Sequence, residues 1–140
     1  VLEAIAAAEL IVFCPSNPIV SIGPILAVPG LRAALADARA PKVAVSPIVA
    51  GRALRGPADQ MLGSLGHDVS ALGVARLYGD LVQGFVMDSE DEALRADIEA
   101  LGVRVVCTET VMSSDGDRRR LALSTVDFGL SLSGVATGAA

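Results

Sequence analysis

Two loops contain the residue types that could bind an anionic ligand, and the first runs from Cys14 to Pro24. Its polar side chains, Ser16, Asn17 and Ser21, stand among prolines that fix the backbone torsion φ. Such a loop leaves backbone amides, hydroxyls and a side-chain amide available to hold a phosphate or the edge of a purine. The alternative is an ordinary rigid turn, because proline and serine are common in turns.

The second loop, residues 46–57, combines a serine, two glycines and two arginines directly before a helical pattern. Glycine lets the backbone approach a phosphate closely, a helix N-terminus supplies positive potential, and arginine binds phosphate oxygens with two hydrogen bonds. We therefore expect an anionic ligand near Arg52 and Arg55. The loop matches no Walker or Rossmann glycine pattern, and solvated surface arginines are the alternative.

Both loops follow short apolar runs that are typical of buried parallel strands. We predict strands at residues 9–14, 42–47, 84–88 and 103–107. The spacing of apolar residues, with glycine or proline at the ends, predicts helices at 31–39, 57–65, 70–81 and 90–101. Strands that alternate with helices form a parallel sheet covered on both faces, and ligands bind at the carboxyl ends of its strands. The two loops should therefore lie side by side at one edge of the sheet.

The composition limits the class of protein. The 140 residues carry 11 basic and 16 acidic side chains, a net charge of −5, and 52% of them are hydrophobic. This balance supports one compact domain and excludes a disordered or fibrous chain. Only 3% of the residues are aromatic, so this acidic chain is poorly suited to bind nucleic acid, although backbone amides can still hold a mononucleotide.

Cysteine spacing and hydropathy favour a reduced, cytoplasmic setting. Cys14 and Cys107 lie far apart with no CxxC or Cys/His spacing, which indicates neither a zinc site nor a disulfide framework. The apolar runs are about ten residues long and interrupted by prolines, too short for a membrane span, and no signal peptide is visible. The chain begins with Val1 inside a helical pattern, so we expect a fragment whose upstream part is missing.

Several blocks of sequence resemble the carboxyl-terminal half of the 2-phospho-L-lactate transferases, in order and in spacing. They are Ser16-Asn17-Pro18, residues 21–30 (SIGPILAVPG), residues 46–49 (SPIV) with 51–59 (GRALRGPAD), and residues 66–75 (GHDVSALGVA). The resemblance covers residues 9–123 and implies a Rossmann-like α/β fold that is incomplete at its N-terminal side. We expect residues 1–123 to form this half-domain and residues 124–140 to be a tail, rich in glycine, serine and alanine, that follows the family poorly.

The resemblance implies a transferase of coenzyme F-420 biosynthesis. Such an enzyme moves 2-phospholactate, or enolpyruvyl phosphate in bacterial relatives, from a guanosine diphosphate-linked donor to the deazaflavin Fo and releases GMP. It implies magnesium as a cofactor, held by acidic ligands in a part of the family that precedes this chain, and no metal ligand within the chain. A homodimer is compatible with the resemblance, and neither a nucleic acid nor a membrane is an expected partner.

The nucleotide-binding loops of the family fall on nine residues of this sequence: Ser16, Asn17, Ser21, Ile22, Ser46, Pro47, Gly51, Arg55 and Gly56. Asn17 has the amide geometry to bind a guanine edge. Ser21 and Ser46 can donate to phosphate oxygens, and Arg55 can neutralise a diphosphate. Two positions depart from the family, because Cys14 stands in place of a glycine and Arg55 in place of a lysine. No catalytic residue is identifiable in this half.

The other chemically capable residues favour structural roles. His67 lies at a helix junction, where capping or packing explains it, and Arg76 and Tyr78 either reach the site from a helix or pack on the surface. The acidic cluster within residues 88–92 compensates the dipole of the helix that it begins. The arginines at 118–120 form a solvated helix face.

An alternative function comes from a distantly related class. Gluconeogenesis-factor proteins share the expected fold and loop positions but resemble regulatory binders of nucleotide sugars. The sequence of residues 46–59 follows the transferases rather than these regulators. The transferase is therefore the leading hypothesis, and a non-enzymatic regulator that binds nucleotide sugars is the alternative.

Overall fold

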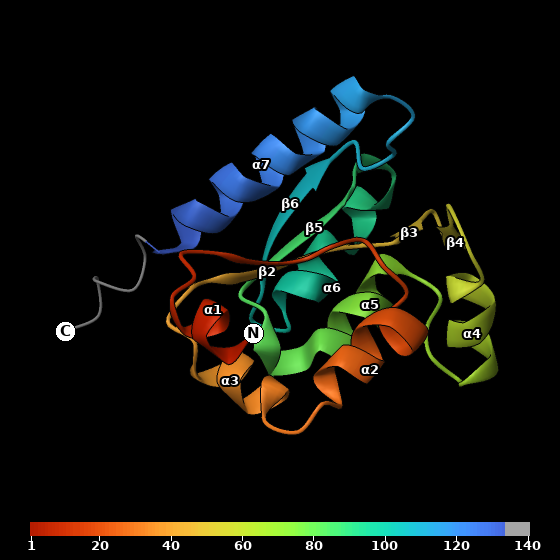
Figure 1. Ribbon diagram of the computed structural model, residues 1–140. Coiled ribbons are helices and arrows are strands. Elements are labelled where there is room, and N and C mark those ends of the chain that lie inside the picture. Colours follow the sequence, from red (N-terminus) through yellow and green to blue (C-terminus); the bar gives the residue numbers. More distant parts are fainter. Residues whose placement is uncertain (134–140) are drawn as a thin grey trace.

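The computed structural model describes residues 1–133, and its centre is a four-stranded parallel sheet (Figure 1). In spatial order the strands are β1 (Ile11–Phe13), β2 (Lys42–Val45), β5 (Gly84–Asp88) and β6 (Arg104–Thr108). One row of paired residues across the sheet runs through Val12, Val43, Gly84 and Arg104. Each strand lies within or overlaps one of the four predicted apolar runs, so the predicted parallel α/β sheet is confirmed.

Helices connect the strands and cover both faces of the sheet. The α-helices are α1 (Leu2–Ala6), α2 (Gly23–Leu26), α3 (Leu31–Asp37), α4 (Ala58–Ser64), α5 (Ala71–Tyr78), α6 (Arg95–Glu99) and α7 (Asp115–Ser133). Three further helical turns are the π-helical η1 (Pro18–Ile22) and the 3-10 turns η2 (Gly79–Leu81) and η3 (Ser89–Leu94). In Figure 1, α7 lies along one side of the sheet, and α1, α3, α5 and α6 lie on the other side.

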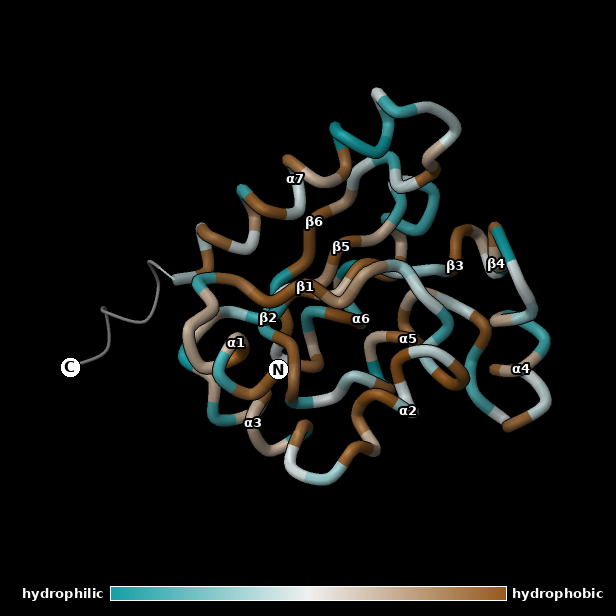
Figure 2. The backbone as a smooth tube through the Cα atoms, viewed as in Figure 1, coloured by the Kyte–Doolittle hydropathy of each residue, from teal (hydrophilic) through white to brown (hydrophobic). Residues whose placement is uncertain are grey.

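The core is divided between these two faces. The larger cluster lies under the helices that connect the strands and includes Ala44, Phe85, Leu35, Tyr78 and Ile98. The smaller cluster lies under α7 and consists of Val43, Val45, Val86 and Leu121. Figure 2 shows apolar residues along the strands and at intervals along the helices on both sides of the sheet. The central strands are therefore buried on both faces, which explains their continuous apolar sequences.

Two glycines let α7 lie close against the sheet. A Cβ atom on Gly84 would lie 2.7 Å from the ring of Phe128, and one on Gly129 would overlap the side chain of Leu10. Because neither position has a side chain, the helix axis can approach the strands. This close packing joins the C-terminal half of α7 to the amino end of β5.

Helix α7 extends past the boundary expected at residue 123. Leu121, Thr125, Phe128 and Leu132 recur at helical spacing and are turned toward the sheet. The tail expected from residue 124 therefore begins within this helix, and its residues 134–140 lie outside the described residues. Although α7 has 19 residues, no single helix within residues 1–133 combines the length and the apolar composition for crossing a membrane, and the one pair that does, Pro18–Leu26 with Leu31–Asp37, is bent by 84°.

Besides the first loop, which is helical at residues 18–26, the structure differs from the sequence-based prediction in two connections. The second loop contains a small antiparallel hairpin of β3 (Ile48–Val49) and β4 (Arg52–Ala53). The single helix predicted at 90–101 is instead the 3-10 turn η3 followed by the shorter helix α6. The two differences are linked, because the buried Asp91 of η3 accepts a hydrogen bond from Ala50 in the hairpin.

Candidate functional site

A cavity of about 640 Å³ opens at the carboxyl edge of the parallel sheet. Its lining comes from the segments that follow β1, β2 and β6 and from the first turn of α7: Pro15, Ser16, Asn17, Val20, Ser21, Ser46, Pro47, Leu54, Arg55, Gly56, Pro57, Ala58, Thr110, Val111, Met112, Ser113 and Arg118. The two loops predicted to lie side by side are therefore brought together at one edge. Parallel strands place their carboxyl ends at the same edge, which accounts for the juxtaposition.

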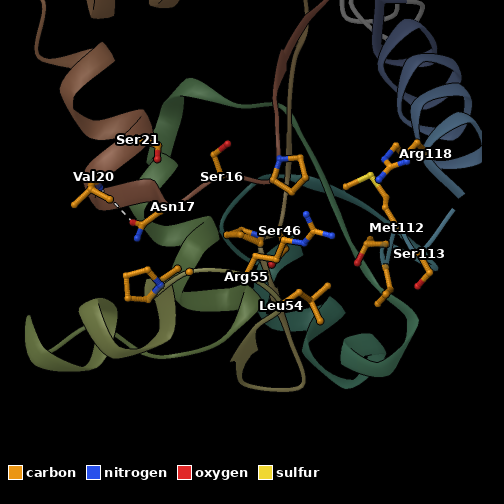
Figure 3. Close-up of a pocket in the computed structure, with 17 residues that line it drawn as sticks. Ser16, Asn17, Val20, Ser21, Ser46, Leu54, Arg55, Met112, Ser113 and Arg118 are labelled. Carbon is orange, nitrogen blue, oxygen red and sulfur yellow. Dashed lines mark hydrogen bonds between the residues drawn. The ribbon is translucent and has the colours of Figure 1, made fainter. Parts of the chain in front are cut away.

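Figure 3 shows how these segments surround the cavity. Asn17 and Ser21 lie on one side, and Met112 and Arg118 lie on the other. Arg55 lies between the two sides, so its guanidinium faces the space that they enclose.

The first loop is helical in the structure, and Asn17 begins the helical segment. Its side-chain oxygen accepts hydrogen bonds from the amides of Ile19 (2.9 Å) and Val20 (3.2 Å), and its amide nitrogen lies 3.4 Å from the sulfur of Met61. The capping uses the side-chain oxygen of Asn17, and the binding of a guanine edge by its amide stays a prediction. Asn17 fixes the start of η1, whose residues Val20 and Ser21 line the cavity.

Ser46 is also committed to the fold. Its side chain is 2% exposed, and its hydroxyl donates to the carbonyl of Ile48 (2.9 Å) and accepts from the amide of Ile48 (3.1 Å). The hydroxyl hydrogen predicted to bind a phosphate oxygen is therefore used within the chain. Ser46 lines the cavity, but its main effect is to turn the chain from β2 into the hairpin.

Two of the nine predicted residues lie away from the cavity lining. Ile22 packs against the larger hydrophobic cluster because it lies on the inner side of η1. Gly51 forms the turn of the hairpin with a φ of 75°, a conformation that favours glycine. The other seven predicted residues line the cavity.

Arg55 is the cation at the centre of the cavity. It lies on an exposed span, Leu54 to Pro57, in which Gly56 has a φ of 71°. Within residues 1–133 no carboxylate lies at ion-pair distance from Arg55, so its charge is available to a ligand. A free guanidinium beside an open cavity is suited to an anion.

The far wall of the cavity comes from residues that the sequence analysis missed. Thr110 to Ser113 follow β6, and Arg118 belongs to the first turns of α7. The arginines at 118–120 are exposed, as predicted, but Arg118, which pairs with Asp115, also lines the cavity. The carboxyl-end rule, applied to the fourth strand, would have pointed to Thr110–Ser113.

The acidic cluster supports this wall through hydrogen bonds. Asp88 is 5% exposed and accepts from the amide and hydroxyl of Thr110 and from the amide of Glu90. Burial alone would raise the pKa of Asp88, but these hydrogen bonds outweigh it and hold the pKa below its usual value. Within the described part of the chain no three His, Cys, Asp or Glu side chains lie close enough to form a metal site.

The remaining candidates lie outside the cavity. His67 is exposed at the junction of α4 and α5, where its amide donates to the carbonyl of Leu62 (2.9 Å). Tyr78 is 1% exposed and packs on Phe13, and Arg76 is exposed and faces Asp68, so neither reaches the cavity.

Cys14 lines a second, smaller cavity of about 270 Å³ that adjoins the first. Pro15, Met112 and Arg118 line both cavities. Cys14 is therefore exposed at the side of the candidate site rather than inside it.

Comparison with known proteins gives one consistent result. The family model described as 2-phospho-L-lactate transferase CofD matches residues 1–116. The chain is 46% identical over 130 residues to a phosphoenolpyruvate transferase of Kitasatospora aureofaciens, which covers 89% of this chain and 40% of that protein. It is 40% identical over 122 residues to a 2-phospho-L-lactate transferase of Methanothermobacter thermautotrophicus, which covers 87% of this chain and 39% of that protein. The chain thus spans about 40% of the length of these relatives.

Proposed function

The chain belongs to the 2-phospho-L-lactate transferase CofD family, and from that premise we propose that it is part of a transferase of coenzyme F-420 biosynthesis. The proposed donor is a guanosine diphosphate-linked three-carbon acid, and the proposed acceptor is the deazaflavin Fo. The terminal ribityl oxygen of Fo forms a bond to the phosphorus that carries the acid. The bond from that phosphorus to the bridging anhydride oxygen breaks, GMP leaves, and the hydroxyl proton is lost.

The observation that carries this proposal is the pair of arginines at one cavity. Arg55 and Arg118 both line the space of about 640 Å³: Arg118, which pairs with Asp115, lies on one side together with Met112, and Arg55 lies between the two sides. Positive charge here suits a diphosphate, because charge moves onto the leaving phosphate as the bond breaks. The size of the cavity is also suited to a nucleotide.

The comparisons favour enolpyruvate over lactate as the acid. Five relatives named phosphoenolpyruvate transferase are 42% to 49% identical to this chain. Three relatives named 2-phospho-L-lactate transferase are 39%, 40% and 41% identical. We therefore place the protein with the phosphoenolpyruvate transferases.

Magnesium is the proposed cofactor, but the described residues contain no site for it. No cluster of three suitable side chains occurs within residues 1–133, so these residues do not fit a bound metal ion. The proposed ligands belong to the part of the relatives that this chain does not match. The contribution assigned to this chain is to bind and orient the nucleotide.

The proposal is tested by following GMP. The full-length protein that contains this sequence is incubated with Fo, magnesium and the guanylylated enolpyruvate donor, and GMP is measured by chromatography. We expect GMP release that depends on Fo. Residues 1–140 alone should bind GDP without turnover, because catalysis needs both reaction partners held in line, and the proposed metal ligands lie outside this chain. Nucleotide binding by the full-length protein without any GMP release would favour the regulator.

A further inference from the structure

Asp91 connects the acidic turn η3 to the hairpin beside the cavity. Its side chain is 7% exposed, and both carboxylate oxygens lie 3.2 Å from the backbone nitrogen of Ala50. Asp91 is 41 residues away from Ala50 along the chain, so this contact is made only by the folded protein. Asp91 does not line the cavity itself.

Ala50 has an unusual backbone conformation. Its φ is 48°, which makes it the only non-glycine residue with a positive φ in the part of the chain that the structure describes. A residue with a Cβ is strained in this region and persists there only where its surroundings hold it. Ala50 and Gly51 form a two-residue turn in which both φ values are positive, a turn that favours Asn-Gly over Ala-Gly.

The paired hairpin residues leave the Ala50 amide without a partner on the opposite strand. Ile48 pairs with Ala53 and Val49 pairs with Arg52, so the N–H of Ala50 lies outside the ladder. Asp91 supplies its acceptor. The carboxylate therefore both satisfies this donor and holds the strained turn in place.

The position of the hairpin decides where the arginine loop lies. The hairpin is held at Ile48 by Ser46, at Ala50 by Asp91, and at Ala53 by Asp59, whose carboxylate lies 3.3 Å from the Ala53 nitrogen. The next four residues, 54–57, line the cavity, and the chain is fixed again at Ala58, which is 2% exposed. A shift of the turn at Ala50 should therefore also move Arg55, because only a short span of chain separates the hairpin from Ala58.

Keeping a carboxylate at this place is unfavourable by itself. Burial raises the pKa of Asp91, the hydrogen bond from Ala50 lowers it, and the neighbouring charges of Asp88 and Glu90 raise it, with a net upward shift. A group held against desolvation and like charge indicates a specific requirement at this position.

We propose that Asp91 is a positioning residue for the nucleotide site: by binding the Ala50 amide it fixes the hairpin and holds Arg55 in the orientation that receives the diphosphate. The proposal rests on the proposed function for the identity of the ligand. It needs no contact between Asp91 and the ligand. Loss of Asp91 should weaken binding because the loop is then no longer organised before the ligand arrives.

The test combines GDP affinity with amide hydrogen exchange. The protein used is the full-length protein that contains this sequence. Its affinity for GDP in the presence of magnesium is measured by calorimetry for wild type, for Asp91→Ala and Asp91→Asn, and for the control Asp97→Ala. Asp97 is an exposed residue of α6 with no side-chain hydrogen bond within the described residues. Asp91→Leu, which fills the buried site without an acceptor, replaces Asp91→Ala if that variant does not fold.

We expect Asp91→Ala to raise the Kd for GDP about tenfold, the effect of losing about 1.4 kcal/mol. Asp91→Asn keeps a side-chain oxygen for the Ala50 amide and should stay within about threefold of wild type. Asp97→Ala should leave the Kd unchanged. In Asp91→Ala, exchange should accelerate at residues 48–56 and remain slow in β5 and β6.

Two results would overturn the inference: an unchanged Kd in a folded variant without the acceptor, or loss of the fold in both Asp91→Ala and Asp91→Leu. The second result would assign Asp91 to the stability of the whole domain. If wild type itself does not bind GDP, the proposed function fails, whereas the exchange experiment still decides whether Asp91 holds the hairpin. The two failures are therefore distinguishable.

Discussion

The carboxylate of Asp88 accepts hydrogen bonds from both the backbone amide (2.7 Å) and the hydroxyl (2.9 Å) of Thr110. Asp88 is the last residue of β5, and Thr110 follows β6, so this pair joins the carboxyl ends of two neighbouring strands. Thr110 also lines the cavity. The acidic residue predicted to serve the helix dipole therefore also supports one wall of the candidate site.

Asp88→Asn should make the stability of the protein less dependent on pH. The pKa of Asp88 is lowered in the folded state, so its carboxylate stabilises the fold above the unfolded value of about 3.8 and ceases to do so as the pH falls through the lower, folded value. At pH 7 we expect a loss of about 1–3 kcal/mol, because a buried hydrogen-bonded charge is replaced. The difference from wild type should shrink below about pH 4.

Urea unfolding at several pH values measures this effect. Asp97→Asn is the matched control, because Asp97 is exposed and should give a small difference at every pH. A loss of stability in Asp88→Asn that stays constant from pH 7 to pH 3 would contradict the assigned charge effect.

The sheet and the place of the site were predictable from the sequence because both depend on local patterns. Val43 to Val45 form an apolar run with two β-branched valines, which indicates a strand buried on both faces, and the polar segment after it marks a carboxyl end. Strand direction then follows from the alternation with helices. These steps require no knowledge of how side chains pack.

The details of the site were not predictable, because they depend on contacts between distant residues. The hairpin strands have only two residues each, too few for a pattern, and they are held by Asp91 from another connection. Arg118 stands in a run of three arginines that resembles a solvated face. It lines the cavity because α7 begins at Asp115, directly after the segment Thr110–Ser113 that forms the same wall.

Gly73→Ala should destabilise the fold by about 1–3 kcal/mol, the usual cost of overpacking. Gly73 is buried in the first turn of α5, and a Cβ there would overlap the carbonyl oxygen of Asp68 and lie 2.8 Å from its carbonyl carbon. Backbone atoms cannot move aside as a flexible side chain can. Thermal or chemical unfolding measures the difference in the free energy of unfolding between Gly73→Ala and wild type.

Gly63→Ala is the opposing control for that prediction. Gly63 lies on the exposed side of α4, and its Cβ would make an ordinary 3.5 Å contact with Val69. We expect Gly63→Ala to lose no stability, or to gain up to about 1 kcal/mol from the higher helix propensity of alanine. If both alanine variants had the same stability, the close approach at Gly73 would not be the controlling factor.

Tyr78→Phe should leave the free energy of unfolding unchanged or raise it by up to about 1 kcal/mol. The Tyr78 hydroxyl is buried without a hydrogen-bond partner within the described residues, and burial, with a smaller effect of Cys14, raises its pKa to about 12. Phenylalanine keeps the ring contact with Phe13, whose centroid lies 5.3 Å away, and removes the unsatisfied group. A loss above about 1 kcal/mol in urea unfolding would instead reveal a partner for the hydroxyl.

Arg55→Ala should weaken GDP binding far more than Arg119→Ala does. Arg55 lines the cavity and has no carboxylate partner within residues 1–133, whereas Arg119 is exposed on α7 outside the cavity lining. A charge-assisted contact to phosphate is worth about 1.5–3 kcal/mol, against about 0–0.5 kcal/mol for an exposed surface residue. Calorimetry should therefore show at least a tenfold rise in Kd for Arg55→Ala.

Arg55→Lys should restore part of the affinity, because it keeps the charge but loses the two-point contact. Equal Kd values for the Arg55→Ala and Arg119→Ala variants would refute the assignment of Arg55 to the nucleotide site.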